Sequence, residues 1–124
     1  MAGEVREIWY VYMIRTERGE LYTGIAKSIC RRMRQHTEKK QGAKFTRSRR
    51  IVAVASLWSC EEKGQALSLE YALKHLTKKQ KERLVACPRL LSTLLPAMEK
   101  EDYIHHPMAD LSLFLGQITL CDLP

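Results

Sequence analysis

Two short apolar runs, rich in aromatic and branched residues, form the first elements of the pattern. One extends from Ile8 to Ile14 and the other from Leu21 to Ile25, with the polar segment Thr16-Glu17-Arg18-Gly19 between them. Such residues favour strands, and a short polar segment with a glycine favours a turn. The pattern predicts a hairpin, and Ser28 directly after it predicts the cap of a helix that runs to about Glu38.

The middle of the chain shows one more strand pattern and two helix patterns. Ile51 to Cys60 is branched and apolar, which predicts a third strand buried on at least one face. Apolar residues recur at helical spacing from Gln65 to His75, although Glu70 falls inside that apolar stripe. Thr77 followed three residues later by Gln80 is typical of a capping box, which predicts a further helix through about Ala86.

The last third of the chain differs in composition. Residues 87–124 are leucine-rich and acidic on balance, and Pro88, Pro96 and Pro107 punctuate them. We expect one short helix after Pro88 and assign no structure to the apolar segment near Leu111 to Leu120. A length of 124 residues with 45% hydrophobic content suits one compact domain, which we place at residues 1–86, plus this tail. We expect the tail to pack on the domain or on a partner, or to mediate self-association.

Positive charge is concentrated in the first half. The net charge is +7, and the segment from Lys27 to Arg50 holds ten basic residues against the single Glu38. This density is expected of a surface that meets a polyanion, although a solvated basic helix and loop would give the same pattern. An acidic lipid surface is disfavoured, because the segment has no large apolar face. The candidate nucleic-acid-binding residues are Lys27, Arg31, Lys39, Lys40, Lys44, Thr46, Arg47, Arg49 and Arg50.

The chain shows no secretory leader and no apolar run approaching 18 residues, so we expect a cytoplasmic protein. Its four cysteines, Cys30, Cys60, Cys87 and Cys121, include no C-x-x-C pair. That spacing favours reduced thiols over disulfides or a zinc site.

Four polar side chains of the hairpin and the following helix are predicted to converge. Tyr12 and Tyr22 lie on strands predicted to pair, and Arg32 and His36 lie one helical turn apart. Such a cluster suits a phosphate group. A single strand tyrosine is more often a core residue, so the prediction depends on the joint spacing of the tyrosines with Arg32.

Glu70 is the carboxylate with the clearest claim to a metal ion. A two-metal nuclease site needs clustered carboxylates, yet residues 1–101 contain no aspartate and their glutamates are scattered. One Mg²⁺ can be held by one carboxylate, water and a substrate phosphate oxygen. The alternative is that Glu70 simply pairs with Lys74, four residues on, and the residues alone leave both interpretations open.

Tyr10-Val11-Tyr12, Tyr22-Thr23-Gly24, Arg32, His36 and Glu70 together resemble the motif residues of the GIY-YIG endonuclease superfamily. The resemblance covers about residues 8–86, although neither three-letter motif is literal. The Gly42–Thr46 segment and the Leu69–Leu84 run are similar to the small bacterial YhbQ-like group. The resemblance implies an α+β fold with a three-stranded antiparallel β-sheet flanked by α-helices, followed here by a C-terminal extension.

The resemblance also implies roles. Tyr12 would take a proton from the attacking water, which requires its pKa to fall by roughly two to three units from about 10. Tyr22 would bind the water or the scissile phosphate, and Arg32 would stabilise the charge that develops in the transition state. His36 would polarise Tyr12 or bind phosphate, and Glu70 would hold Mg²⁺ or Mn²⁺.

Other residues carry weaker predictions. Gly24 is expected to permit a close approach that a side chain would obstruct. Adjacent residues of a regular element point apart, so we discount His105-His106 as a metal pair. Many members of the superfamily carry an Asn near the site, and this chain contains none, which puts full activity in doubt.

The sequence therefore predicts a divalent-metal-dependent endonuclease that hydrolyses DNA phosphodiester bonds, on single-stranded or branched DNA in repair or recombination. The alternative is a catalytically weak or inactive nucleic-acid-binding module of the same fold. A third possibility makes the tail an interaction element that directs or restrains the nuclease fold.

Overall fold

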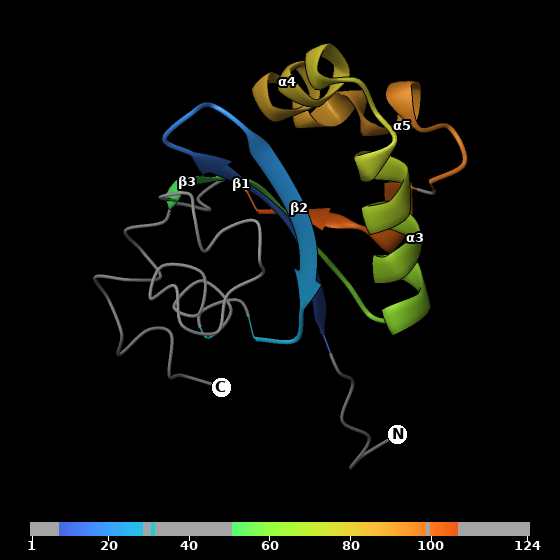
Figure 1. The fold of residues 1–124 in the computed structure, drawn as a ribbon. Helices are drawn as coiled ribbons and strands as arrows, with labels where there is room; N and C mark the ends of the chain where they lie inside the picture. The colour runs from blue at the N-terminus through green and yellow to red at the C-terminus, as the bar shows by residue number, and fades with distance from the viewer. Residues whose placement is uncertain (1–7, 29–30, 32–50, 99, 107–124) are drawn as a thin grey trace, which may run out of the picture.

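A four-stranded antiparallel sheet forms the centre of the molecule (Figure 1). The computed structural model describes residues 8–28, 31, 51–98 and 100–106. The strands are β1 (Trp9–Thr16), β2 (Leu21–Ala26), β3 (Ile51–Cys60) and β4 (Ile104–His105), in the order β2-β1-β3-β4. The α+β class and the three expected strands are confirmed. The fourth strand was not expected: two residues of the C-terminal segment pair with Trp58 and Ser59 on the outer side of β3.

The hairpin between β1 and β2 closes through a glycine in the left-handed region. Gly19 has a φ of 81°, and its N–H donates to the carbonyl of Thr16 at 2.9 Å. The N–H of Thr16 in turn donates to the carbonyl of Glu20 at 3.0 Å. Gly adopts this conformation without steric cost. The turn fixes the register that places Tyr12 opposite Gly24 and Ile14 opposite Tyr22.

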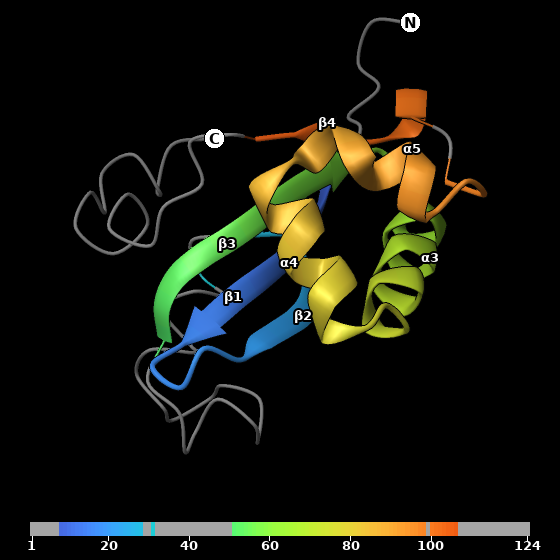
Figure 2. The same cartoon turned by 90° about the horizontal axis from the view of Figure 1, so that it is seen from above.

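The helices whose bounds lie within the described residues come from the second half of the chain and gather on one side of the sheet (Figure 2). They are α3 (Lys63–Lys74), α4 (Lys78–Ala86) and the single turn α5 (Leu91–Leu94), with short 3-10 turns η1 (Pro88–Leu90) and η2 (Lys100–Asp102). The predicted capping box is confirmed: Gln80 N–H donates to Thr77 Oγ1 at 3.1 Å, and Thr77 N–H donates to Gln80 Oε1 at 2.9 Å.

Alternation along the strands gives the sheet two buried faces. The helix-covered face joins strand residues to α3, α4, α5 and the segment before β4, and we call it the aliphatic face because most of its buried members are aliphatic. Its buried members include Val11, Met13, Trp58, Leu69, Leu73, Leu84, Leu91 and Tyr103. The opposite face holds a second cluster of Tyr12, Ile14, Ala26, Ile51, Val54 and Leu57, with Tyr10 and Tyr22 packed against it. We call this second cluster, with its two flanking tyrosines, the tyrosine face.

An ion pair fastens α4 to the hairpin. The Arg15 guanidinium donates to both carboxylate oxygens of Glu82, at 2.9 and 2.7 Å. Lys78 also pairs with Glu82, at 3.1 Å, and its ammonium group donates to the carbonyl of Gly19. The bidentate hydrogen bonds from Arg15 are the main cause that lowers the pKa of Glu82 to about 2.

The structure describes two of the four cysteines, and Cys30 and Cys121 lie outside the described residues. Cys60 and Cys87 are free thiols, and burial raises the pKa of the Cys60 thiol. Among the described helices, none has the length and apolar character needed to cross a membrane.

Candidate active site

Tyr12 and Tyr22, the two tyrosines predicted to act together, lie on the same face of the sheet. Tyr12 is opposite Gly24 on β2, and Tyr22 is two residues before that glycine, so the tyrosines are diagonal neighbours. Both belong to the tyrosine face; Tyr12 is 2% exposed and Tyr22 is half-buried. Pairing of two regular strands therefore brings these phenols together, without any contribution from a loop.

Gly24 makes room for the Tyr12 ring. A β-carbon at position 24 would lie 2.6 Å from Cζ of Tyr12 and 3.1 Å from its Cε1, and it would collide with the hydroxyl. Such distances are well inside van der Waals contact, so either the ring or strand β2 would have to move. Among the described residues, Gly19 is the glycine with a positive φ, so the backbone conformation at Gly24 is one that other residues also adopt. The absence of a side chain is therefore what position 24 requires.

Glu70 lies on α3, the helix that packs on β1, β2 and β3 from the aliphatic side. Its carboxylate pairs with the ammonium group of Lys74 at 3.3 Å, and its side chain is 20% exposed. This is the ion pair that the sequence offered as the alternative to a metal ligand. The structure brings the two phenols together in one cluster and places Glu70 on a helix whose core residues contact the opposite face.

Several other predicted site residues fall outside the described part of the chain. These are Arg32 and His36 of the expected catalytic set, and Lys39, Lys40, Lys44, Thr46, Arg47, Arg49 and Arg50 of the expected nucleic-acid-binding set. Their roles stay predictions.

Lys27 and Arg31, which the structure does describe, are both exposed at the start of the basic segment. The Lys27 ammonium lies 5.2 Å from the centre of the Trp9 ring, and Lys63 of α3 lies 5.5 Å from the same ring. The backbone N–H of Arg31 donates to Ser28 Oγ at 3.4 Å, which is the cap contact expected of Ser28.

The donor chemistry of the described residues suits at most a single-carboxylate metal site. Within the ranges that the structure covers, no group of three or more His, Cys, Asp and Glu side chains is close enough to share an ion. A carboxylate oxygen such as that of Glu70, completed by water and phosphate oxygens, is a donor set that Mg²⁺ accepts.

His105 is the last residue of β4 and His106 follows it, and their rings have different partners. The His105 ring packs edge-on against Trp58, with 4.8 Å between ring centres, whereas His106 Nε2 lies 2.8 Å from Ser59 Oγ. Burial lowers the pKa of both imidazoles.

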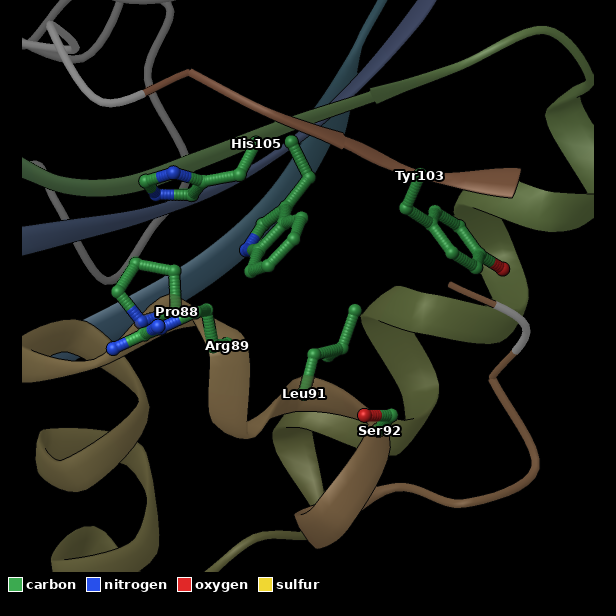
Figure 3. A pocket seen from close by; sticks show the side chains of 7 residues that line it. Pro88, Arg89, Leu91, Ser92, Tyr103 and His105 are labelled. Carbon is green, nitrogen blue, oxygen red and sulfur yellow. The ribbon is translucent and has the colours of Figure 1, made fainter. Parts of the chain in front are cut away.

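A cavity of about 250 Å³ lies on the aliphatic side, and sequence reasoning did not find it. Figure 3 shows Tyr103 and His105 on one side of it and Pro88, Arg89 and Ser92 on the other, with Leu91 pointing between them. Burial raises the pKa of Tyr103 to about 12, and its hydroxyl donates to the carbonyl of Gln65 at 2.9 Å. The surface that its walls present is mostly apolar, and neither strand tyrosine of the predicted site lines it.

Comparison with known proteins identifies the family. The model of the GIY-YIG catalytic domain matches residues 8–83, which include both strand tyrosines, Gly24 and Glu70. The chain belongs to the GIY-YIG family. This is a nuclease family, so the prediction that the chain has a nuclease-type domain is confirmed at the level of the family.

The relatives share most of their length with this GIY-YIG chain. The UPF0213 protein YhbQ of Salmonella typhimurium is 44% identical over 98 residues, which cover 76% of this chain and 97% of the relative. A UPF0213 protein of Serratia proteamaculans is 44% identical over 94 residues, covering 75% and 91%. The solution structure of a UPF0213 protein from Bacillus halodurans is 36% identical, covers 71% of this chain and 96% of its own, and has a TM-score of 0.40. The name UPF0213 states no reaction.

Proposed function

We propose that the chain is a divalent-metal-dependent endonuclease that hydrolyses phosphodiester bonds of single-stranded or branched DNA. The observation that carries the proposal is the packing of the Tyr12 phenol over Gly24, with Tyr22 beside it on the same face. In a family of nucleases, a buried phenol that needs a glycine opposite it is better explained by chemistry than by core packing, which an aliphatic residue would serve equally well.

Tyr12 would accept the proton of the attacking water in this proposal. Its ring is held between the strands and is 2% exposed, so the position of its oxygen is fixed before substrate binds. Tyr22, which is half-buried, would hydrogen-bond the water or a phosphate oxygen. Arg32 and His36 would bind the phosphate and favour the ionised form of Tyr12.

Glu70 would be the residue that holds Mg²⁺ or Mn²⁺. A bound divalent ion would polarise the phosphate and neutralise the charge that develops on it. Glu70 is now paired with Lys74, so the lysine would have to release the carboxylate or share it. We expect Lys74 to turn toward the phosphate backbone when the ion is present.

Binding would come from the basic residues, because phosphate contacts supply most of the affinity for nucleic acid. Lys27 and Arg31 are exposed and begin this surface, and the other candidates are Lys39, Lys40, Lys44, Thr46, Arg47, Arg49 and Arg50. Backbone contacts carry little base information, so we expect recognition of DNA shape and not of sequence.

The test is cleavage of a panel of labelled single strands, flaps, junctions and plain duplex, with Mg²⁺ or Mn²⁺ and with EDTA. We expect metal-dependent cutting by the natural protein. Tyr12→Phe and Glu70→Ala should each lower the rate by at least about a hundred-fold, since each removes a group acting in the transition state. Tyr10→Phe and Glu17→Gln are the controls, because they remove a phenol hydroxyl and a carboxylate at positions to which the proposal gives no catalytic role. A Tyr12→Phe or Glu70→Ala protein that cuts at the natural rate would refute the assignment of that residue.

The inactive-module alternative is favoured by one observation, the Glu70–Lys74 ion pair on the aliphatic side of the sheet. It predicts salt-sensitive binding of DNA without cleavage of any substrate in the panel. Glu70→Ala would then leave binding and stability almost unchanged, because a partly exposed ion pair between residues four apart on a helix contributes little.

A further inference from the structure

An exposed pair of aromatic rings at the C-terminal end of α3 has no part in the proposed chemistry. The rings of Tyr71 and His75 lie 4.1 Å apart between centres, with 34° between their planes. Tyr71 is 67% exposed, the largest exposed fraction among the described large hydrophobic residues. An aromatic ring this open to water buries little area in the fold, so its face is available to a ligand.

The pair is held in place before any ligand arrives. His75 Nδ1 lies 2.7 Å from the carbonyl oxygen of Tyr71, and because a carbonyl only accepts, Nδ1 carries the hydrogen. His75 is also the C-cap of α3, and its backbone N–H donates to the carbonyl of Ala72 at 3.2 Å. Rings already fixed in this way lose little conformational entropy when a ligand stacks on them.

The surroundings of the rings are positively charged. From Tyr71 to Lys81 the chain has four lysines and no acidic residue, and the stretch from Glu70 to Glu82 keeps a net charge of +2. Glu70 pairs with Lys74 at 3.3 Å and Glu82 with Lys78 at 3.1 Å. Lys79 is exposed at the start of α4. A ring pair flanked by lysines favours an anionic, aromatic ligand over an apolar protein segment.

We propose that Tyr71 and His75 form a stacking platform for an unpaired base of single-stranded nucleic acid, with Lys74 and Lys79 contacting its phosphates. Every base presents an aromatic face, so a platform of this kind binds single strands of any sequence. The bases of a duplex are already stacked on each other and cannot occupy it. The inference rests on the proposed function, since it names the unpaired strand as the part of the substrate held beside Glu70.

The test is fluorescence anisotropy of a short labelled oligothymidylate and of a labelled duplex, both with EDTA so that binding is measured without cleavage. Tyr71→Ala should weaken single-strand binding about ten-fold, from the loss of one stacked base. The slope of log affinity against log salt should not change, because no charge is removed. Tyr71→Phe keeps the ring and should bind as the natural protein does. Lys79→Ala should weaken both ligands and lower the slope.

Ile104→Ala is the matched control, since Ile104 is 63% exposed and lies on β4. The proposal is overturned if Tyr71→Ala binds the oligothymidylate as tightly as the natural protein, if Ile104→Ala causes the same loss, or if duplex affinity falls equally. An equal loss for oligouridylate would extend the platform to RNA and support it. If Tyr71→Ala binds and cuts normally while the natural protein cuts DNA, the platform fails and the nuclease stands. If single-strand binding depends on Tyr71 but no substrate is cut, the platform stands and the nuclease fails.

Discussion

The two faces of the central sheet are both buried but are built from different residues. On one face, aliphatic side chains of β1 meet Leu69, Leu73 and Leu84 from the helices, and these leucines are fully buried. On the other, Tyr12 lies over Gly24 with Tyr22 beside it. Other aliphatic residues of similar volume can replace a buried leucine at small cost in stability. A Tyr12 ring that packs over Gly24 leaves no room for any side chain at position 24, so this contact tolerates far less substitution. The comparison assigns stability to the aliphatic face, and our proposal assigns the chemistry to the tyrosine face.

Removal of the C-terminal segment should have the largest effect, and it should act through the aliphatic face. Truncation after Ala86 deletes Leu91 and Tyr103, which are 4% and 8% exposed in that cluster. Loss of two large buried side chains should lower the free energy of unfolding by about 3–6 kcal/mol, measured by urea denaturation. A truncated protein with unchanged stability, oligomeric state and cleavage would show that residues 87–124 are dispensable, and would also exclude the interaction role considered for them.

Local patterns explain how much of the fold the sequence predicts. The hairpin, the third strand and the capping box at Thr77 each depend on residues close together in the chain, and all three are confirmed. Strand β4 could not be foreseen, because two residues carry no periodicity and their pairing with β3 depends on tertiary contacts.

In the candidate site too, the features that depend on local sequence were predicted and those that depend on long-range packing were not. Strand parity and a short hairpin predict that Tyr12 and Tyr22 share a face, and they do. The side of the sheet on which α3 packs is a long-range choice, so the position of Glu70 relative to the tyrosines could not be derived from spacing. The Tyr71–His75 pair did have a signal that was missed, since two aromatic residues four apart on a helix are neighbours.

Gly24→Ala should have the next largest effect, on the tyrosine face. The new methyl group overlaps the Tyr12 ring, so we expect a loss of about 1–3 kcal/mol of stability, together with loss of cleavage as the phenol is displaced. Gly64→Ala is the matched control, because a β-carbon there meets nothing within 4 Å on helix α3. It should be neutral or slightly stabilising, since alanine is the better helix former.

A double-mutant cycle on Tyr12 and Gly24 measures how strongly the two positions are coupled in stability. If Gly24 is needed only because of the Tyr12 ring, then Gly24→Ala should cost much less stability in a Tyr12→Ala background than in the natural protein. Equal costs in the two backgrounds would mean that the glycine serves the backbone of β2, and the contrast between the faces would lose its main support.

The ion pair between Arg15 and Glu82 should give the smallest effect, and one that depends on pH. The pKa of Glu82 is lowered from 4.5 to about 2, mainly by the hydrogen bonds from Arg15. A lowered pKa stabilises the folded state above the unfolded value, so the contribution is complete above about pH 4.5 and is lost as the pH falls toward 2. Because the Glu82 side chain is 37% exposed, solvent screens the pair, and we expect it to contribute about 1 kcal/mol to the free energy of unfolding.

Glu82→Gln should therefore be less stable than the natural protein at pH 7 and nearly equal to it at pH 2, as measured by urea denaturation. The control Glu17→Gln should match the natural protein at both pH values. Cleavage at neutral pH should not respond to Glu82→Gln, because the pair joins α4 to the hairpin on the aliphatic side; a large loss of activity would mean that the hairpin holding both tyrosines depends on this attachment.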